Sequence, residues 1–276
     1  MFFKFFSKGL FVSLATAGIA VAIIGAGNIQ ARTLFKVTFN HDKIGTTPVT
    51  AGYQAGTVST MPTVVGSSTN HSVRVVTKLG GLPHQPAQLK TNNDGGHNKP
   101  LIQFGFNVIS SGTVTISWES EITAYTPPTG GQPVENDLTF RLLNGNGVLF
   151  DGIAYTYTQA QSSGTKYGGS ISVIGASSVS YASGADKHWH INGGVDHFVL
   201  KVNVDKNDFS LSRNGKPLAT GTLGTAGNTG LAYFQIQSGA GIGGYDGKWT
   251  AGVDNVKIAK HKPAPEKKHK HSGKTQ

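Results

Sequence analysis

Two carboxyl groups, Glu119 and Glu121, stand two residues apart in a segment that alternates apolar and polar residues. In a strand they point to the same side, about 6 to 7 Å apart, while Ile116 and Trp118 point to the other. Carboxyl pairs near this separation serve as the acid and the nucleophile or base of glycosidases. The pair is therefore a candidate catalytic site. We favour the alternative, in which both side chains lie on a solvated outer face of the strand.

The second group with suitable chemistry surrounds Trp189. His188 and His190 flank this residue, Asn192 follows, and Tyr181 lies upstream. A tryptophan ring packs on the apolar face of a pyranose, while histidine and asparagine side chains bond to its hydroxyls. These five residues form a candidate ligand-binding loop, and the alternative is a tryptophan that closes one end of the fold. The two histidines could also bind a metal ion, but the sequence places no third ligand.

Other chemical signatures are missing from the sequence. It contains no cysteine, which excludes disulfides and thiol catalysis. The G-x-S-x-G nucleophile motif, the H-E-x-x-H zinc motif and the phosphate-binding loop are absent as well. The glycines of 239–244 precede no helical pattern, so they indicate a loop between strands rather than a nucleotide site.

Residues 1–31 have the pattern of a secretory signal peptide. Lys4 and Lys8 precede an apolar run over 9–27, and Ala31 offers a small residue at the cleavage position. The sequence thus predicts a secreted protein, extracellular, periplasmic or on the cell surface. The alternative is an uncleaved membrane anchor, for which the run is close to the minimum length of about 17 residues.

Basic residues are concentrated at the end of the chain. The formal net charge is +10, but the tail over 260–276 carries many of the lysines, and the body is nearly neutral. We therefore expect no specific nucleic-acid partner. The Lys-, His- and Pro-rich tail is expected to be disordered. It either holds the protein to an acidic cell-surface polymer or serves only to increase solubility.

The chain between these ends predicts about a dozen short strands and no helix. Apolar residues alternate with polar ones in many segments, separated by Gly, Pro and Asn clusters. The segment over 79–100 is expected to be a long polar loop. The expected early strands cover 35–39, 73–76, 102–108, 114–118, 138–142, 148–150, 155–157 and 171–173.

The segment 195–258 carries the clearest strand pattern. Residues 196–204 alternate, 209–213 alternate again, and Asn214-Gly215 is a strong hairpin signal. Two more strands follow, over 231–236 and 253–258. We interpret the four strands as a β-meander that ends the domain.

Three of these motifs together resemble a known class of domain. They are Phe35-x-Val37-x-Phe39-Asn40, the strand 196–204 with Asn214-Gly215, and Val253-Asp254-Asn255-Val256-x-Ile258. Together they resemble the concanavalin A-like, laminin-G-like jelly-roll domains of lectins and glucanases, over residues 32–259. The resemblance implies an all-β fold, an antiparallel two-sheet β-sandwich, in which one sheet is often concave and faces a glycan.

The same resemblance implies a structural calcium site. First and last strands are commonly neighbours in such jelly rolls, which would bring Asp254 close to Asn40 or Asp42. Calcium takes oxygen ligands of this kind. The alternative, which we favour, is that these residues shape local turns, and no other cofactor is expected.

From these observations we expect a secreted, non-catalytic protein that binds a carbohydrate or a cell surface, with a polysaccharide or glycan as its partner. Two alternatives remain. One is a glycan-cleaving enzyme of the same fold, a glycosidase or polysaccharide lyase. The other is a structural or adhesive surface protein anchored by its basic tail. Exposed positions on the strand 196–204, including His197, Lys201 and Asn203, are further candidates for a binding surface.

Overall fold

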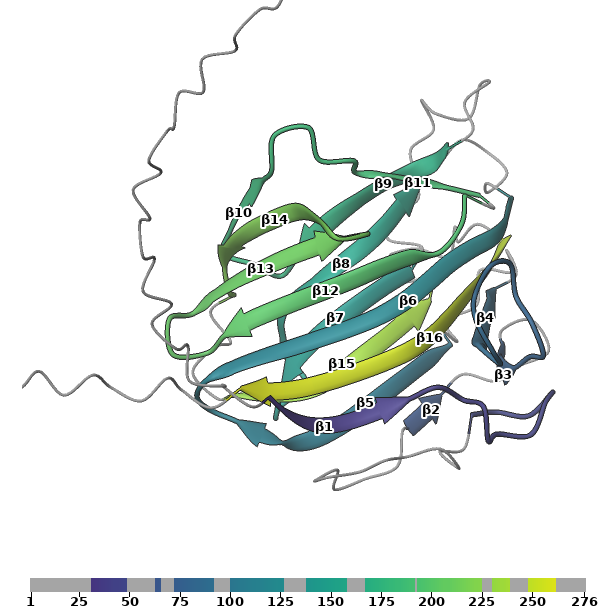
Figure 1. Ribbon diagram of the computed structural model, residues 1–276, viewed down its shortest axis with the longest axis horizontal. Coiled ribbons are helices and arrows are strands. Elements are labelled where there is room, and N and C mark those ends of the chain that lie inside the picture. Colours follow the sequence, from purple (N-terminus) through teal and green to yellow (C-terminus); the bar gives the residue numbers. More distant parts are fainter. Residues whose placement is uncertain are drawn as a thin grey trace, which may run out of the picture.

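The computed structural model describes residues 31–48, 63–65, 72–91, 100–126, 138–157, 167–191, 193–224, 230–238 and 248–261. Every regular element in these ranges is a β-strand, and every strand pairing is antiparallel. The strands form two sheets that face each other (Figure 1). This confirms the predicted two-sheet β-sandwich of jelly-roll type.

Within the described ranges the first sheet has nine strands, with β6 and β16 near its centre. Its order is β10 (Ser178–Tyr181), β14 (Lys216–Thr222), β13 (Asp208–Arg213), β12 (Asp196–Asn203), β6 (Thr113–Thr126), β16 (Lys248–His261), β4 (Ala87–Thr91) and β3 (Ser72–Val75), and β1 (Arg32–Val37) also pairs with β16.

The second sheet has seven strands. Its order is β11 (His188–His190), β9 (Tyr167–Ile174), β8 (Leu149–Tyr157), β7 (Leu138–Asn144), β15 (Leu231–Ser238), β5 (Leu101–Ile109) and β2 (Thr63–Val65). In Figure 1 the strands of the first sheet pass in front of these.

The core between the sheets is centred on Trp118 of β6. Its ring stacks on Phe140 of the second sheet, with 5.0 Å between centroids, and on Phe198 of the first, with 5.2 Å. Phe234 of β15 lies 5.3 Å away. All four side chains are at most 1% exposed. Alternation along each strand places one such residue in two toward the opposite sheet, as the pattern over 114–118 predicted for Ile116 and Trp118.

The hairpin predicted from Asn214-Gly215 is present. It joins β13 to β14, and both turn residues have positive φ, 53° at Asn214 and 75° at Gly215. Two positive φ values are the requirement of a type I′ turn, whose twist matches the flanking strands. The second strand of this hairpin, β14, was not anticipated.

Other predicted connections were wrong. The final four strands do not form one meander, because β15 leaves for the second sheet and β16 returns to the centre of the first. The segment over 79–100 is not only a loop, since β4 lies within it and pairs with β3 and β16. Both errors concern pairing between distant segments, which local alternation does not encode.

The last strand, β16, has an irregularity near its centre, and a different strand pairs with it on each side of this point. Residues 249–253 of β16 pair with β4, while 256–260 pair with β1, and a register shift falls between Asp254 and Lys257. Asn255 has a φ of 50°, as expected at a bulge. The strand runs to His261, two residues beyond the boundary predicted for the tail.

The segments predicted as signal peptide and tail fall largely outside the described residues, which begin at Ala31 and end at His261. Within the part of the chain that the structure describes, no helix has the length and apolar character needed to span a membrane.

Candidate functional site

The candidate binding loop is built differently from the sequence prediction. Trp189 belongs to strand β11 at the edge of the second sheet, and its side chain is only 1% exposed. Its ring packs against Tyr155, with 6.3 Å between centroids. A buried ring has no face for a sugar, so Trp189 closes one end of the core, which was the alternative reading of this residue.

The neighbours of Trp189 also have structural contacts. His188 and His190 are half-buried in β11, which pairs with β9. The Tyr181 hydroxyl accepts a hydrogen bond from the backbone N–H of Val173 at 3.0 Å, and the Lys187 amine lies 4.7 Å from the centre of the Tyr181 ring. Asn192 lies outside the described residues.

A buried ion pair lies beside this loop and was not anticipated. Arg213, at the end of β13, binds both carboxylate oxygens of Asp196, through Nε at 2.7 Å and Nη2 at 3.0 Å. Burial opposes the charge of Arg213, but its bonds to Asp196 outweigh this effect and raise its pKa above the ordinary value. Such a two-pronged contact fixes the direction of the guanidinium as well as its charge.

The remaining nitrogen of Arg213 reaches across to the other sheet. Nη1 donates to the carbonyl oxygens of Asp186 at 3.1 Å and His188 at 2.7 Å. It also lies 3.7 Å from the Asp186 carboxylate. Arg213 therefore joins the first sheet to the loop that leads into β11, and it fixes the backbone of that loop.

Tyr155 extends this polar network into the core. Its hydroxyl donates to Asp196 at 3.1 Å and lies 3.0 Å from the Ser120 hydroxyl. Complete burial, together with the negative charge of Asp196, raises the pKa of Tyr155 well above its usual range. The phenol is thus neutral and serves as a hydrogen-bond donor, so it is no candidate for a general base.

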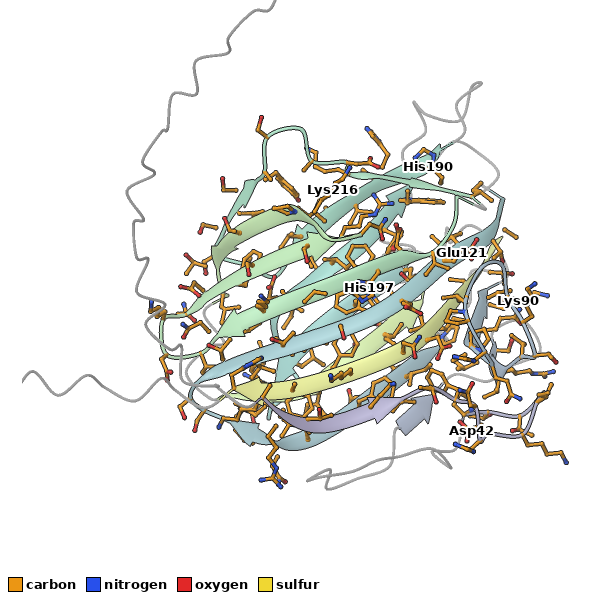
Figure 2. All side chains as sticks on the ribbon, in the orientation of Figure 1. Asp42, Lys90, Glu121, His190, His197 and Lys216 are labelled. Carbon is orange, nitrogen blue, oxygen red and sulfur yellow. The ribbon has the colours of Figure 1, made fainter. Side chains whose placement is uncertain are left out.

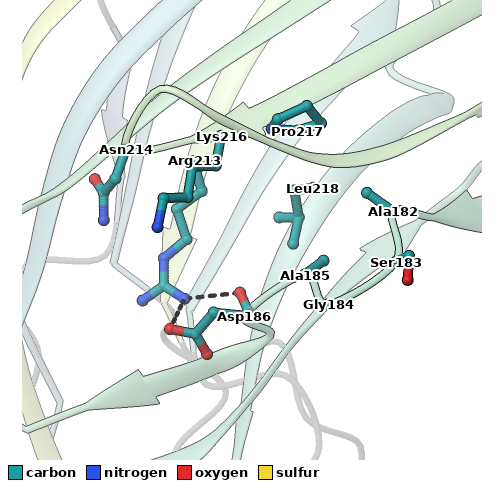
Figure 3. Close-up of a pocket in the computed structure, with 10 residues that line it drawn as sticks. All are labelled: Ala182, Ser183, Gly184, Ala185, Asp186, Arg213, Asn214, Lys216, Pro217 and Leu218. Carbon is teal, nitrogen blue, oxygen red and sulfur yellow. Dashed lines mark hydrogen bonds and ion pairs between the residues drawn. The ribbon is translucent and has the colours of Figure 1, made fainter.

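Next to this network is a pocket of about 410 Å³ (Figure 3). One wall is the loop 182–186, and the other is the hairpin 213–218. Pro217, Leu218, Ala182 and Ala185 provide apolar surface, while the polar lining consists of Ser183, Asp186, Arg213, Asn214 and Lys216. The volume falls in the range of about 300 to 1,000 Å³ that is typical of small-molecule sites.

The carboxylate of Asp186 is the open acceptor of this pocket. Its side chain is 66% exposed, although Oδ1 accepts the backbone N–H of His188 at 3.0 Å. Asn214, on the facing hairpin, donates to Asp196 at 3.2 Å and accepts the backbone N–H of His197 at 2.8 Å. Both walls are therefore held by hydrogen bonds within the protein.

The two glutamates of β6 do not form an exposed pair. Glu121 is only 4% exposed, and its carboxylate accepts the backbone N–H of Gly81 at 2.6 Å. A Cβ at Gly80 would collide with the same carboxylate. Glu119 is half-buried and accepts a hydrogen bond from the Asn255 amide at 2.7 Å. The expectation that both lie in solvent is wrong for Glu121, because the turn at 80–81 covers it.

The outer face of the first sheet carries other polar residues (Figure 2). His197 is exposed and lies directly opposite Glu119. Lys201 and Asn203, further along β12, line a separate hollow of about 570 Å³ together with Asp208 and Thr220 of the adjoining strands. His197 is not among the residues that line this hollow.

The proposed calcium ligands lie near the irregular centre of β16. Asp254 is fully buried, Oδ1 accepts the Asn255 N–H at 2.7 Å, and Oδ2 has no hydrogen-bond partner among the described residues. Burial raises the pKa of Asp254 to about 7, with Glu119 contributing in the same direction. Because β1 ends opposite Val256, the turn that carries Asn40 and Asp42 begins beside this point.

One of the proposed calcium ligands, Asn40, contacts a residue that the sequence did not indicate. Gln85 donates its backbone N–H to the Asn40 amide oxygen at 3.2 Å, and its own side-chain oxygen is buried without a partner. Among the described residues no three His, Asp or Glu side chains are grouped to hold a metal ion. A calcium ion here would therefore depend on Asp254 together with amide and backbone carbonyl oxygens, which suit this cation.

The structure thus adds Arg213, Asp196 and Asn214 to the site. Asn214 was noted only as a turn residue, and the other two stand 17 residues apart on neighbouring strands. The one available signal in the sequence was that Arg213 is a charged residue at the end of an alternating strand. This position by itself does not indicate that its partner is Asp196.

No family model matches the sequence. No curated protein matches it either. Solved structures, however, share the arrangement of strands. The carbohydrate esterase of Shiga toxin-encoding bacteriophage phi24B aligns with a TM-score of 0.51 at 10% identity, over 84% of this chain and 100% of that one.

Two other similar structures align less closely. A sialidase aligns with a TM-score of 0.44 at 10% identity, over 68% of this chain and only 18% of the sialidase. The alginate lyase A1-II' aligns with a TM-score of 0.40 at 13% identity, over 68% of this chain and 83% of the lyase. At such identities the likeness concerns the fold and not the activity. The chain has the concanavalin A-like jelly-roll fold.

Proposed function

We propose that this protein is exported and binds a carbohydrate without cleaving it, using the pocket between the loop 182–186 and the hairpin 213–218. The observation that carries the proposal is the composition of this pocket. Apolar surface from Pro217 and Leu218 stands beside the polar groups of Asp186, Asn214 and Lys216. A sugar ring has one apolar face and a rim of hydroxyls, so it needs both kinds of surface.

The state of the pocket before binding supports this role. Arg213 holds one wall through the carbonyl oxygens of Asp186 and His188, and Asn214 is bonded to Asp196. A site that is already ordered loses little conformational entropy when a ligand binds. Modest hydrogen bonds to hydroxyls then suffice for useful affinity.

Binding is favoured over hydrolysis because the acids do not converge. Asp186 is the only carboxyl group among the pocket-lining residues, whereas both common glycosidase mechanisms need two. Glu119 and Glu121 lie on β6 and are bonded to Asn255 and Gly81. A glycan-cleaving enzyme remains the alternative, and release of reducing ends from a panel of polysaccharides would reveal it.

The test is a screen of the full chain, without its first 31 residues, against neutral and charged glycans, followed by calorimetric titration of the best ligand. Asp186→Asn keeps the Oδ1 acceptor that orders the loop but removes the charge, and it is expected to weaken binding about fivefold or more. Lys206→Gln, on an exposed turn outside the pocket, serves as the matched control and is expected to bind normally. Undiminished affinity in Asp186→Asn and in Lys216→Ala would refute the assignment of the pocket.

Two further parts of the proposal concern regions around the site. We propose that Asp254, with Asn40, Gln85 and Asp42 nearby, holds a structural calcium ion. The unpartnered Oδ2 of Asp254 supports this, and the test is given below. We also propose that the lysine-rich tail attaches the protein to an acidic cell-surface polymer, which deletion of 262–276 would test through loss of salt-sensitive surface retention.

A further inference from the structure

The outer face of the second sheet carries a row of three polar side chains. Arg141 on β7 pairs with Gln235 on β15, and Gln235 pairs with Gln103 on β5. Cross-strand partners point to the same side of a sheet. Because Phe140 points into the core against Trp118, Arg141 and its two partners point outward.

Among the described residues, the guanidinium of Arg141 has no hydrogen-bond acceptor or counter-charge. It is half-buried, and its Nε is inaccessible to solvent and donates no hydrogen bond. In the described part of the chain no carboxylate lies within ion-pair distance of its guanidinium. Burial lowers the pKa of Arg141, in contrast to Arg213, whose three nitrogens all have acceptors. Buried donors and buried charges in folded proteins are normally satisfied, so this exception calls for an explanation.

The surroundings of Arg141 are suited to a ligand. The Gln235 amide donates to Gln103 Oε1 at 3.0 Å, which leaves the Gln235 oxygen as an acceptor and the Gln103 amide as a donor. On the other side, Arg141 pairs with Gly152 of β8. Gly152 contributes no side chain beside Arg141. A larger residue could not replace it without rearrangement, because its Cβ would collide with the Phe140 carbonyl oxygen.

We propose that this row is a second binding site, specific for acidic sugars, in which Arg141 binds the carboxylate of a uronate unit and the two glutamines bind hydroxyls of the chain beside it. Arginine presents paired N–H donors that match a carboxylate. An acidic peptide is the competing ligand, but extended peptides usually bind by adding to an open strand edge. Both edges of β7 are already occupied, by β15 and β8.

This site is separate from the pocket of the proposed function. The pocket is formed by the hairpin of the first sheet and the loop before β11, whereas Arg141 lies on the central strand of the second sheet. Each site can therefore be removed without disturbing the residues of the other.

The experiment is calorimetric titration of the full chain, without its first 31 residues, with hexamers of galacturonate, glucuronate and mannuronate. The methyl esters of the same hexamers and poly-L-glutamate are the comparison ligands. At least one uronate hexamer is expected to bind, and Arg141→Gln is expected to weaken it at least about tenfold, as loss of a charged hydrogen bond predicts. Esterification removes the carboxylate charge of the hexamer. The affinity of the wild-type protein for the methyl ester should therefore be as low as the affinity of Arg141→Gln for the free acid. Arg141→Lys should recover part of the affinity, because it restores the charge without the paired donors.

The controls separate binding from folding. Arg74→Gln removes an exposed arginine on β3 and should leave uronate binding unchanged. Arg141→Gln should keep or raise the melting temperature, since a half-buried charge without a partner stabilises nothing. The proposal is overturned if no uronate hexamer binds, if Arg141→Gln binds as wild type does, or if this variant melts markedly earlier. Arg141-dependent binding of poly-L-glutamate with equal affinity would assign the site to an acidic peptide instead.

Discussion

Replacement of Asp151 by asparagine is expected to stabilise the protein, increasingly so as the pH rises. Asp151 lies on β8 opposite Leu142, on the core side of the second sheet, and is 1% exposed. Its Oδ1 accepts the Gly152 N–H at 2.9 Å, while Oδ2 has no hydrogen-bond partner in the part of the chain that the structure describes. Burial raises the pKa of Asp151 to about 8, so the folded chain carries this group as the neutral acid at pH 7.

The direction and size of the effect follow from proton binding. Between about pH 4 and pH 8 the folded chain keeps the Asp151 proton while the unfolded chain has lost it. The free energy of unfolding therefore decreases by about 1.4 kcal/mol per pH unit over this range because of Asp151 alone. Asparagine has nearly the same shape, retains the acceptor for Gly152 and does not titrate. Relative to wild type, the variant should gain about 4 kcal/mol between pH 5 and pH 8.

Urea unfolding followed by tryptophan fluorescence, repeated at each half pH unit from 4.5 to 8.5, measures this difference. Asp208→Asn, at an exposed position of β13, is the matched control and should follow the wild-type curve closely. Asp254 contributes a decrease of the same sign up to about pH 7 in both wild type and variant, so it cancels in the comparison. A difference between Asp151→Asn and wild type that stays constant with pH would refute the reasoning.

Three other outcomes are expected. Arg213→Ala should cost about 3 to 5 kcal/mol in urea unfolding, because it leaves Asp196 buried without its counter-charge, and a cost below 1 kcal/mol would contradict the role of the pair. If calcium binds at Asp254, calcium should raise the melting temperature more at pH 8 than at pH 5, because the carboxylate with a pKa of about 7 must be ionised. Asp254→Asn should abolish this gain, and a melting temperature indifferent to chelator at pH 8 would exclude the ion. Gly221→Ala should destabilise the chain by more than about 1 kcal/mol, since its Cβ would collide with the Ser178 carbonyl oxygen, and an unchanged unfolding midpoint would count against the β10–β14 pairing.

The predictions of local structure succeeded where neighbouring residues determine the outcome. Alternation identified the buried face of β12 and of the first part of β6, because successive side chains of any strand point to opposite sides. It was wrong at the end of β5, where Val108 is exposed, and it does not describe β7, which is buried on both faces. Asn214-Gly215 predicted a hairpin for a similar reason, since its positive φ values favour one turn geometry. Strands with weak alternation, such as β4 and β11, were missed. They form because they pair with neighbouring strands of the sheet, and the local sequence carries no signal of this pairing.

The candidate site was predicted only in part. The sequence directed attention to the residues around Trp189, whereas the pocket is lined by the preceding loop 182–186 and by none of the five residues proposed as ligand-binding. Burial of Trp189, however, depends on packing against Tyr155 of β8. The sequence of the loop does not reveal this contact. The same holds for Glu121, whose environment is set by a turn 40 residues away.

By itself, then, the sequence determined that the chain is built of strands, that Asn214-Gly215 forms a hairpin turn, and which side of the clearly alternating strands is buried, because alternation and turn chemistry act over a few residues. Only the tertiary structure decided which strands are neighbours, and hence that Glu119 and Glu121 are not an exposed pair, that Arg213 meets Asp196, and that Arg141 has no counter-charge among the described residues. Pairing between distant strands sets the burial and the partners of each polar group, and these two quantities decide whether a residue supports the fold or is available to a ligand.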